Sequence, residues 1–198
     1  MFARLLRAPL TWIVLAVLLV GAGAGLYWFQ PWKLVTDQQV TESLATPEAG
    51  PSAPAGTPGT TAPSGAPGST ATAGPAAGAT RPVLVSRGEF VSHEHRTTGA
   101  ARIVRLPDGS HRLELVGLAT SNGPDLRVWL TDQPVRTGRA GWQVFDDGRW
   151  VELARLKGNR GDQSYPIPAN VDLTDLGSVT IWCKRFAVSF GAAPLQPA

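Results

Sequence analysis

The chain of 198 residues contains a single cysteine, Cys183, and a single methionine, Met1. An intramolecular disulfide is therefore excluded, and so is covalent c-type haem, because no Cys-x-x-Cys-His sequence occurs. Closed zinc motifs, phosphate-binding loops and nucleophile elbows are also missing. The sequence thus gives no support to a hydrolase.

Charge is scarce as well, and its two signs are mixed. Charged residues make up 17% of the chain and the formal net charge is +3. From residue 83 onward fourteen Lys and Arg residues stand against twelve Asp and Glu residues, with arginine strongly preferred. No block of five or six like charges occurs, so we expect no nucleic-acid partner.

The longest uncharged run covers residues 10–29, LTWIVLAVLLVGAGAGLYWF. As a helix it has about the length needed to cross a hydrocarbon core of about 30 Å. Arg4 and Arg7 precede it, whereas Asp37 and Glu42 follow. The positive-inside rule then predicts a cytoplasmic N-terminus (residues 1–9), a single-pass cell-membrane anchor (residues 10–32) and an extracytoplasmic C-terminal part.

A cleaved signal peptide is the competing interpretation of this run. Ala22-Gly23-Ala24 is small enough for a signal peptidase site. The apolar run nevertheless continues into an aromatic cluster suited to a membrane interface, which favours an uncleaved anchor. The cluster consists of Tyr27, Trp28, Phe29 and Trp32. Both interpretations place the rest of the chain outside the cytoplasm.

Residues 33–82 are interpreted as a linker. Its main part, residues 46–81, consists almost entirely of Pro, Ala, Gly, Ser and Thr. Such a composition cannot bury enough apolar surface to offset the entropy of ordering. We expect a disordered tether that holds the following domain off the membrane surface.

Residues 83–198 form the expected folded unit, and their pattern is all-β. Short runs of alternating apolar residues are separated by turn signals, and no capped helical pattern follows residue 32. One hairpin is predicted from residues 99–116 around Pro107-Asp108-Gly109-Ser110, and further strands at residues 126–130, 150–156 and 178–190. This spacing predicts a single β-sandwich or partly open barrel.

The last of these segments positions the cysteine. Val179, Ile181 and Cys183 share one face of the predicted strand, and the apolar phase then switches after Arg185. A phase switch within an unbroken run predicts a bulge or a sharp bend near Lys184 and Arg185. Cys183 is therefore expected to point inward, near the rim of the core.

The folded unit resembles the DM-thirteen domain, an extracytoplasmic module described as an electron-transfer domain. The resemblance covers residues 88 to about 195 and rests on the order and spacing of several motifs. These are Gly88-Glu-Phe90, His95 with Thr98-Gly99, Gly123-Pro-Asp-Leu126 leading into Val128-Trp-Leu130, Leu156-Lys-Gly158, Gly161-Asp-Gln-Ser-Tyr165 and Ser178-Val-Thr-Ile-Trp-Cys-Lys-Arg-Phe-Ala-Val-Ser-Phe-Gly191. The resemblance implies a β domain in a membrane-anchored protein of bacterial type. It also implies that Cys183 is the family's hallmark cysteine, acting as a redox thiol or holding a prosthetic group such as haem.

Two interpretations of Cys183 remain open at this point. It is either a small buried hydrophobic residue, as free cysteines often are, or a thiol whose pKa is lowered by Lys184 and Arg185. His93 and His95 form a His-x-His pair, which shares one face if the stretch is a strand. Together with Cys183 they would supply the ligand set of a copper electron-transfer site. Haem held by Cys183, alone or with His95, is the other candidate cofactor.

The predicted function is that of a membrane-anchored extracytoplasmic redox or electron-transfer accessory module. Cys183 would be its reactive or ligating residue, His95 and His93 its candidate helpers, and a redox protein its partner. The alternative is a non-catalytic module that binds an envelope protein or a glycan and in which Cys183 is structural. Whether the chain is itself an enzyme stays open, and a non-catalytic redox or binding module is the favoured interpretation.

Overall fold

The computed structural model describes residues 9–47 and 81–198, and begins with one long helix. Helix α2 (Pro9–Phe29) contains no charged residue and is followed by a short 3-10 helix, η1 (Pro31–Val35). Helix α2 ends because Gln30 adopts a left-handed conformation with φ of 45° and Pro31 cannot continue the helix.

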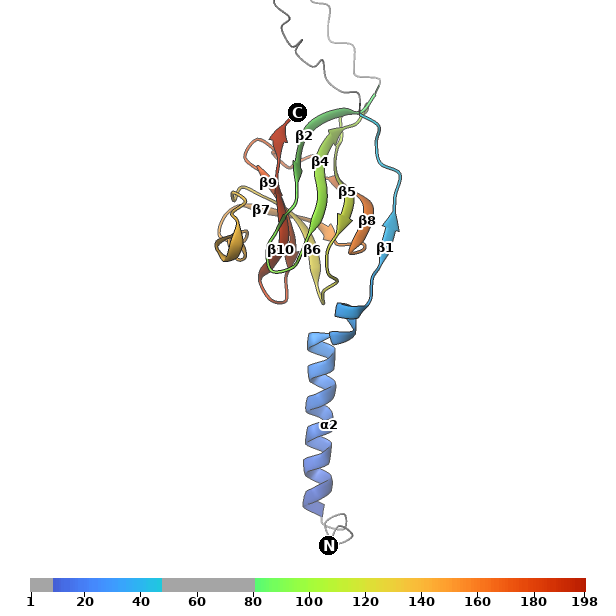
Figure 1. The fold of residues 1–198 in the computed structure, drawn as a ribbon, viewed down its shortest axis with the longest axis vertical. Helices are drawn as coiled ribbons and strands as arrows, with labels where there is room; N and C mark the ends of the chain where they lie inside the picture. Colours follow the sequence, from blue (N-terminus) through green and yellow to red (C-terminus); the bar gives the residue numbers. More distant parts are fainter. Residues whose placement is uncertain (1–8, 48–80) are drawn as a thin grey trace, which may run out of the picture.

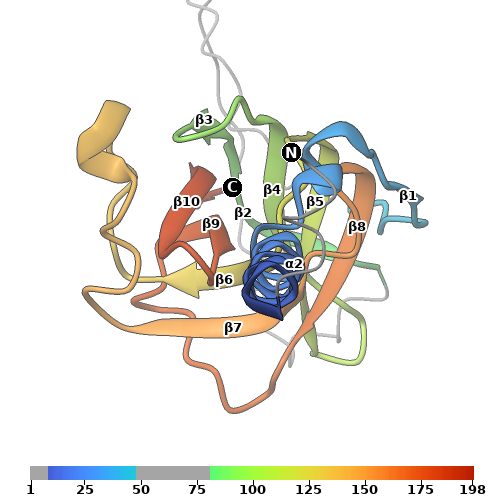
Figure 2. The same ribbon diagram turned by 90° about the horizontal axis from the view of Figure 1, so that it is seen from below.

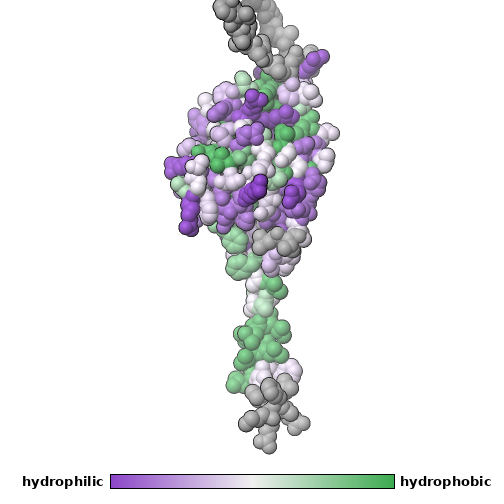
Figure 3. All heavy atoms as spheres, viewed as in Figure 1, coloured by the Kyte–Doolittle hydropathy of each residue, from purple (hydrophilic) through white to green (hydrophobic). Residues whose placement is uncertain are grey.

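Helix α2 exposes apolar side chains on all sides and projects away from the rest of the molecule (Figures 1 and 3). Residues 10–33 are long and apolar enough to cross a membrane, a property that signal sequences share. Apart from its last turn, which contacts residues 185 and 186, the helix is exposed and apolar all round, the pattern of a membrane span or of a signal sequence.

Two β-sheets form the domain. The six-stranded sheet has the order β1-β8-β5-β4-β2-β11 and the five-stranded sheet has the order β3-β10-β9-β6-β7. The strands of the first are β1 (Gln39–Thr41), β8 (Arg160–Ile167), β5 (His111–Ala119), β4 (Thr98–Arg105), β2 (Val83–Glu89) and β11 (Gln196–Pro197). Those of the second are β3 (Val91–Ser92), β10 (Val188–Pro194), β9 (Ser178–Cys183), β6 (Leu126–Thr131) and β7 (Trp150–Arg155).

The main core lies between the two sheets, which confirms the predicted all-β class as a sandwich (Figures 1 and 2). Alternating residues of both sheets fill this core, as the pleat requires. A second, smaller core covers the outer face of the five-stranded sheet. It consists of Trp129, Phe145, Trp182 and Ala192, with Val135 and Val144 packed against it. All six residues of β9 are buried as a result, because both faces of this central strand are covered.

The predicted hairpin is confirmed as β4 and β5, which pair antiparallel from Thr98 to Ala119. Gly109 in its turn has a φ of +83°, a conformation that glycine adopts readily. The Asp108 carboxylate accepts a hydrogen bond from the Ser110 amide at 2.9 Å and closes the turn.

The structure differs from the prediction in residues 33–47, which sequence analysis assigned to the disordered linker. Residues 39–41 form β1, which pairs in parallel with β8 at the edge of the six-stranded sheet. Residues 36–45, here called the strap, run along this edge away from α2 (Figure 1). The rest of the predicted linker, residues 48–80, lies outside the described residues.

Polar contacts tie the strap to the domain along its length. Near its start the Asp37 carboxylate pairs with Arg160 at 2.7 Å. Farther on the Glu42 carboxylate pairs with Lys157 at 2.7 Å. At its end the Ala45 amide donates to Glu114 at 2.7 Å. Gln39-Val40-Thr41 is too short and too polar to indicate a strand by itself, and it forms one because the edge of β8 offers a partner.

The strap changes how the domain stands relative to α2. The chain runs from α2 directly onto the domain, and β1 carries it along the edge of the sheet toward the far end, where β2 begins (Figure 1). At the end nearest to α2, the side-chain amide of Asn122 donates to the Thr36 carbonyl at 3.2 Å, and Lys33 Nζ donates to the Pro124 carbonyl at 3.5 Å. The domain therefore sits against the end of the helix.

We predict that Gly158→Ala loosens the strap. A Cβ at Gly158 would lie 2.4 Å from the Gln38 carbonyl oxygen and 2.7 Å from Val40 Cγ2. We expect faster amide hydrogen exchange in residues 38–42 and a loss of about 1–3 kcal/mol of stability, typical of overpacking. Gly177→Ala, where nothing lies within 4 Å of the added Cβ, is the matched control. Equal exchange in both variants would contradict the assigned pairing of the strap.

Candidate functional site

Cys183 is the last residue of β9 and points into the core between the sheets, as the strand parity predicts. Its exposed fraction is 0%. The residue pairs with Val188 on β10 and with Leu126 on β6, and it shares the core with Ile181. Its side chain thus sits at the end of the core nearest to α2.

A tight turn follows Cys183 at the predicted bend. Residues 184–187, here called the docking turn, connect β9 to β10. The Phe186 amide donates to the Cys183 carbonyl at 3.2 Å, and the Lys184 amide donates to the Asp125 carbonyl at 3.0 Å. The phase switch in the sequence thus marks a hairpin turn, and a register shift follows between Ser189 and Gly191.

Burial raises the pKa of the Cys183 thiol above its ordinary value. Backbone amides of Phe186, Arg185 and Asp125 oppose the shift only in part. The hypothesis of a pKa lowered by the neighbouring cations is therefore wrong. The physical reason is that both cations are directed elsewhere: Lys184 Nζ lies 3.4 Å from Glu152, and Arg185 reaches helix α2.

The docking turn rests on the C-terminal end of α2. The Arg185 guanidinium donates to the backbone carbonyls of Tyr27, at 3.3 Å, and of Trp28, and it lies 5.1 Å from the centre of the Trp28 ring. The rings of Phe186 and Phe29 stack with centroids 6.1 Å apart. Carbonyls in the last turn of a helix lack intrahelical partners and attract cations, so Arg185 satisfies this helix end.

His93 is fully committed to structural hydrogen bonds. Its Nε2 lies 2.9 Å from the Arg136 carbonyl, which can only accept, so Nε2 carries the proton. Its Nδ1 then accepts from the Ser189 hydroxyl at 2.7 Å. Burial lowers the pKa of His93, while the bond to the Arg136 carbonyl raises it less. His93 therefore sits as a neutral ring packed on Phe145 at 5.6 Å.

His95 contacts the opposite face of the same sheet. Its ring lies 3.9 Å from the ring of Phe190, a member of the main core. Burial lowers the pKa of His95, against a smaller effect of Glu94. Strand β3 ends at Ser92, and the chain bends through residues 93–95. Both imidazoles would share one face only on a continuous strand, and this condition is not met.

These positions do not fit the two candidate cofactors. Within residues 9–47 and 81–198, no three His, Cys, Asp or Glu side chains are placed to hold one metal ion. Cys183, His93 and His95 therefore do not form a copper site in this conformation. Haem ligation needs open space beside the sulfur, whereas Cys183 is enclosed by core residues. We derive no chemistry through either group.

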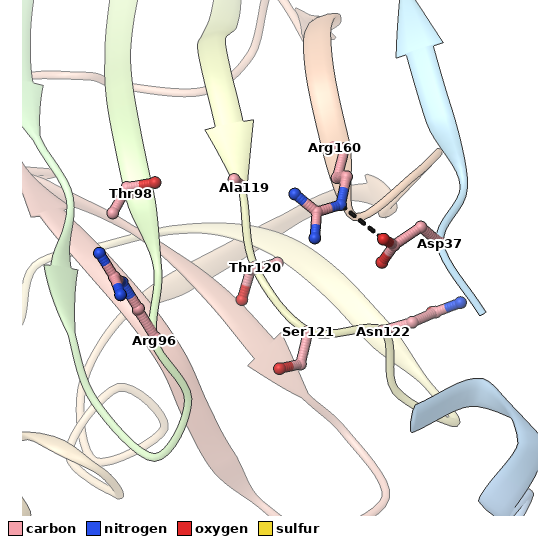
Figure 4. Close-up of a pocket in the computed structure, with 8 residues that line it drawn as sticks. All are labelled: Asp37, Arg96, Thr98, Ala119, Thr120, Ser121, Asn122 and Arg160. Atoms are coloured by element: carbon pink, nitrogen blue, oxygen red, sulfur yellow. Dashed lines mark hydrogen bonds and ion pairs between the residues drawn. The ribbon is translucent and has the colours of Figure 1, made fainter. Parts of the chain in front are cut away.

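A polar cleft of about 570 Å³ opens at the end of the domain nearest to α2 (Figure 4). The ion pair between Arg160 and Asp37 forms one wall, and Arg96 projects from the other side. The cleft is further lined by Thr98, Ala119, Thr120, Ser121 and Asn122. The sequence did not indicate this cleft, because Asp37 belongs to the strap, which was assigned to the linker. Cys183 does not line it, and its polar walls suit a small polar ligand.

A stack of three indoles crosses the outer face of the five-stranded sheet. Trp150 and Trp129 are nearly parallel with centroids 4.0 Å apart, and Trp129 and Trp182 follow at 5.1 Å. Trp129 and Trp182 are buried, while Trp150 is 41% exposed. The stacking depends on strand register, which the sequence pattern alone does not show.

We predict that Cys183 makes the domain less stable at alkaline pH. Its folded pKa is raised, so the unfolded chain, with a thiol pKa of about 8.5, loses its proton first. Stability is then fully present below about pH 8.5 and falls above it, by at most about 1.4 kcal/mol per pH unit.

The measurement is urea unfolding of the full chain in detergent micelles between neutral pH and the onset of tyrosine ionisation. Cys183→Ala, which keeps Tyr165 and all other titrating groups, should lose this part of the pH dependence. If the free energy of unfolding depends on pH equally in both proteins, the thiol ionises as readily in the folded chain as in the unfolded one, which would contradict the prediction.

Comparison with protein-family models matches residues 89–195 to the family described as Electron transfer DM13. The matched segment contains the docking turn, Cys183 and the three stacked indoles, and excludes α2 and the strap. Comparisons with curated proteins and with solved structures find no match. Since the family model covers more than half of the chain and agrees with the motifs that carry the resemblance, the chain belongs to the electron transfer DM13 family.

Proposed function

We propose that this chain is a membrane-anchored, extracytoplasmic electron-transfer accessory module whose reacting group is the thiol of Cys183. Membership of the electron transfer family supports the general role. The apolar helix α2 and the arginines that precede it support a single-pass anchor with the domain outside. The strap supports a domain that stands directly on the membrane surface, in place of the expected tethered one.

The observation that carries the proposal is the position of the docking turn. It closes the end of the core over Cys183 and is itself fastened to α2 by Arg185 and Phe186. Access to the thiol therefore depends on a contact between the domain and its anchor. Lifting the turn from the helix would expose the sulfur at the membrane surface.

The proposed chemistry is thiol–disulfide exchange by a thiol that is buried while the docking turn rests on α2 and reacts once the turn is lifted. In the closed state the raised pKa keeps Cys183 protonated and unreactive. Once exposed to water it ionises more readily, and its thiolate can attack a disulfide of a partner protein. A mixed disulfide forms and one thiolate of this partner leaves. A thiolate of a second, dithiol partner then attacks the Cys183 sulfur and releases the first partner as a dithiol. The other thiolate of the second partner displaces Cys183 and closes a disulfide there, so that two electrons pass from the second partner to the first.

A second candidate is favoured by the same burial. A binding module for an envelope protein or glycan would need Cys183 only as a core residue, and a fully buried thiol with a raised pKa suits that role. The two candidates differ in one respect. Only the redox proposal requires that the docking turn controls the reactivity of the thiol.

We predict that Arg185→Ala speeds the reaction of Cys183 with 4,4′-dithiodipyridine in the folded full chain, held in detergent micelles. This small disulfide undergoes the exchange proposed above and releases a thiopyridone that is followed by absorbance. Hydrogen bonds to a charged group contribute about 1.5–3 kcal/mol, so their loss should raise the opening equilibrium and the rate about tenfold or more.

Arg149→Ala is the matched control, because Arg149 is an exposed arginine paired with Asp175 away from the turn. Cys183→Ala should release no thiopyridone, which assigns the signal to this thiol. If Arg185→Ala and Arg149→Ala react as slowly as the unaltered chain, and all react once unfolded, Cys183 is a packed core residue and the second candidate stands.

A further inference from the structure

We propose that Trp150, Trp129 and Trp182 form a one-electron relay from the surface of strand β7 into the interior of the five-stranded sheet. The inference rests on the electron-transfer function proposed above, but it requires no particular role for Cys183. It assigns the exposed indole of Trp150 as the point where a partner's redox centre exchanges electrons with this domain.

Strand register produces the stack. Thr131 pairs with Trp150 and Trp129 with Glu152, so Trp150 is the diagonal neighbour of Trp129. Trp129 pairs with Thr180 and Arg127 with Trp182, so Trp182 is its diagonal neighbour on the other side. Diagonal neighbours on one face of a sheet lie within reach of aromatic side chains. The three rings therefore follow one oblique line across β7, β6 and β9.

The contacts are close enough for direct electronic overlap. Trp150 and Trp129 are 4.0 Å apart at an interplanar angle of 6°, which places their ring faces in van der Waals contact. Trp129 and Trp182 follow at 5.1 Å and 26°. The ring-to-ring contact is direct at both steps, so an electron need not cross a saturated side chain.

The two ends of the stack differ in their surroundings. Trp150 lies on the edge strand of the sheet with 41% of its surface exposed, so an outside redox centre can approach its ring. Trp182 is 1% exposed and continues into the smaller core through Phe145, at 6.4 Å. It also directly precedes Cys183, whose side chain points to the opposite face.

The middle ring donates a hydrogen bond to a carboxylate, and this contact favours a positive charge on the indole. Trp129 Nε1 donates to the Glu152 carboxylate at 3.2 Å. Arg127 at 2.5 Å and Lys184 at 3.4 Å also contact this carboxylate and oppose the effect. The carboxylate, however, is in direct hydrogen-bond contact with the indole, and such a contact stabilises an indole radical cation. Trp129 is therefore the indole on which we expect the radical cation to be most stable.

The relay step conserves atoms. A one-electron oxidant, such as a high-potential metal complex or metal centre, takes one electron from Trp150 and is itself reduced by one electron. Trp129 then supplies an electron to Trp150 and keeps the vacancy, which it shares with Trp182. No bond forms or breaks, and the proton on Trp129 Nε1 stays in its hydrogen bond to Glu152. An electron returned by the reduced metal complex restores the stack.

The test is flash photolysis of the full chain in detergent micelles, in which a soluble electron acceptor converts photoexcited ruthenium(II) tris-bipyridine to the ruthenium(III) complex that serves as the oxidant. Transient absorption follows the indole radical and its decay. In the unaltered chain we expect rapid formation and a slow phase of decay from the buried radical. Trp150→Phe should slow its formation, Trp129→Phe should remove the slow phase, and Glu152→Gln should shorten it.

Trp142→Phe is the matched control, because Trp142 is a partly buried indole that packs against the main core and lies outside the stack. Thermal melting and circular dichroism establish that each variant is folded. If Trp129→Phe does not fold, the rate of radical formation in Trp150→Phe alone tests the relay. The relay is refuted if Trp150→Phe and Trp142→Phe form the radical at equal rates and with equal decay. Cys183→Ser should leave the slow phase intact, so that a failure of the thiol proposal and a failure of the relay are separate results.

Discussion

The contact between Arg185 and the end of helix α2 is the interaction on which the rest of the arrangement depends. The guanidinium donates to the Tyr27 and Trp28 carbonyls in the last turn of the helix, and Phe186 stacks on Phe29 beside it. This contact joins two parts that the sequence separates by about 150 residues. It places the end of the β9–β10 hairpin, and with it Cys183, at the exit of the helix. The strap repeats the attachment from the other sheet, through Asp37 and Glu42.

The thiol and the stacked indoles occupy opposite faces of the same strand. Cys183 faces the apolar core between the sheets, where desolvation raises its pKa and keeps it protonated. Trp182, one residue earlier, faces the smaller core and ends the stack that begins at Trp150. The central position of β9, buried on both faces, therefore brings Cys183 and the stacked indoles within one residue of each other. The proposed thiol chemistry and the proposed relay can be separated by experiment, yet both use this strand.

Local pattern predicted the features that are encoded locally. The alternation of Val179, Ile181 and Cys183 gave the inward orientation of the thiol, and Asp108-Gly109 gave the β4–β5 turn. Features that depend on distant partners were not predictable. Gln39-Val40-Thr41 becomes a strand only at the edge of β8, and the stack of Trp150 on Trp129 requires the register of β6 and β7. The rings of His93 and His95 lie on opposite faces because β3 ends at Ser92, which the sequence pattern did not indicate. The cations beside Cys183 were misjudged because their long side chains have other partners.

The central claim is that the docking turn is seated on the helix and covers the thiol. Cysteines introduced in place of Phe29 and Phe186, whose rings are 6.1 Å apart, test it directly in the full chain reconstituted in lipid. In a Cys183→Ala background we expect mild oxidation to join the two positions in nearly every molecule, as judged by mass and by protease mapping. With Cys183 restored, the cross-linked chain should not react with a disulfide reagent until it is unfolded. Failure to cross-link, or a thiol that reacts freely in the cross-linked chain, would contradict the account.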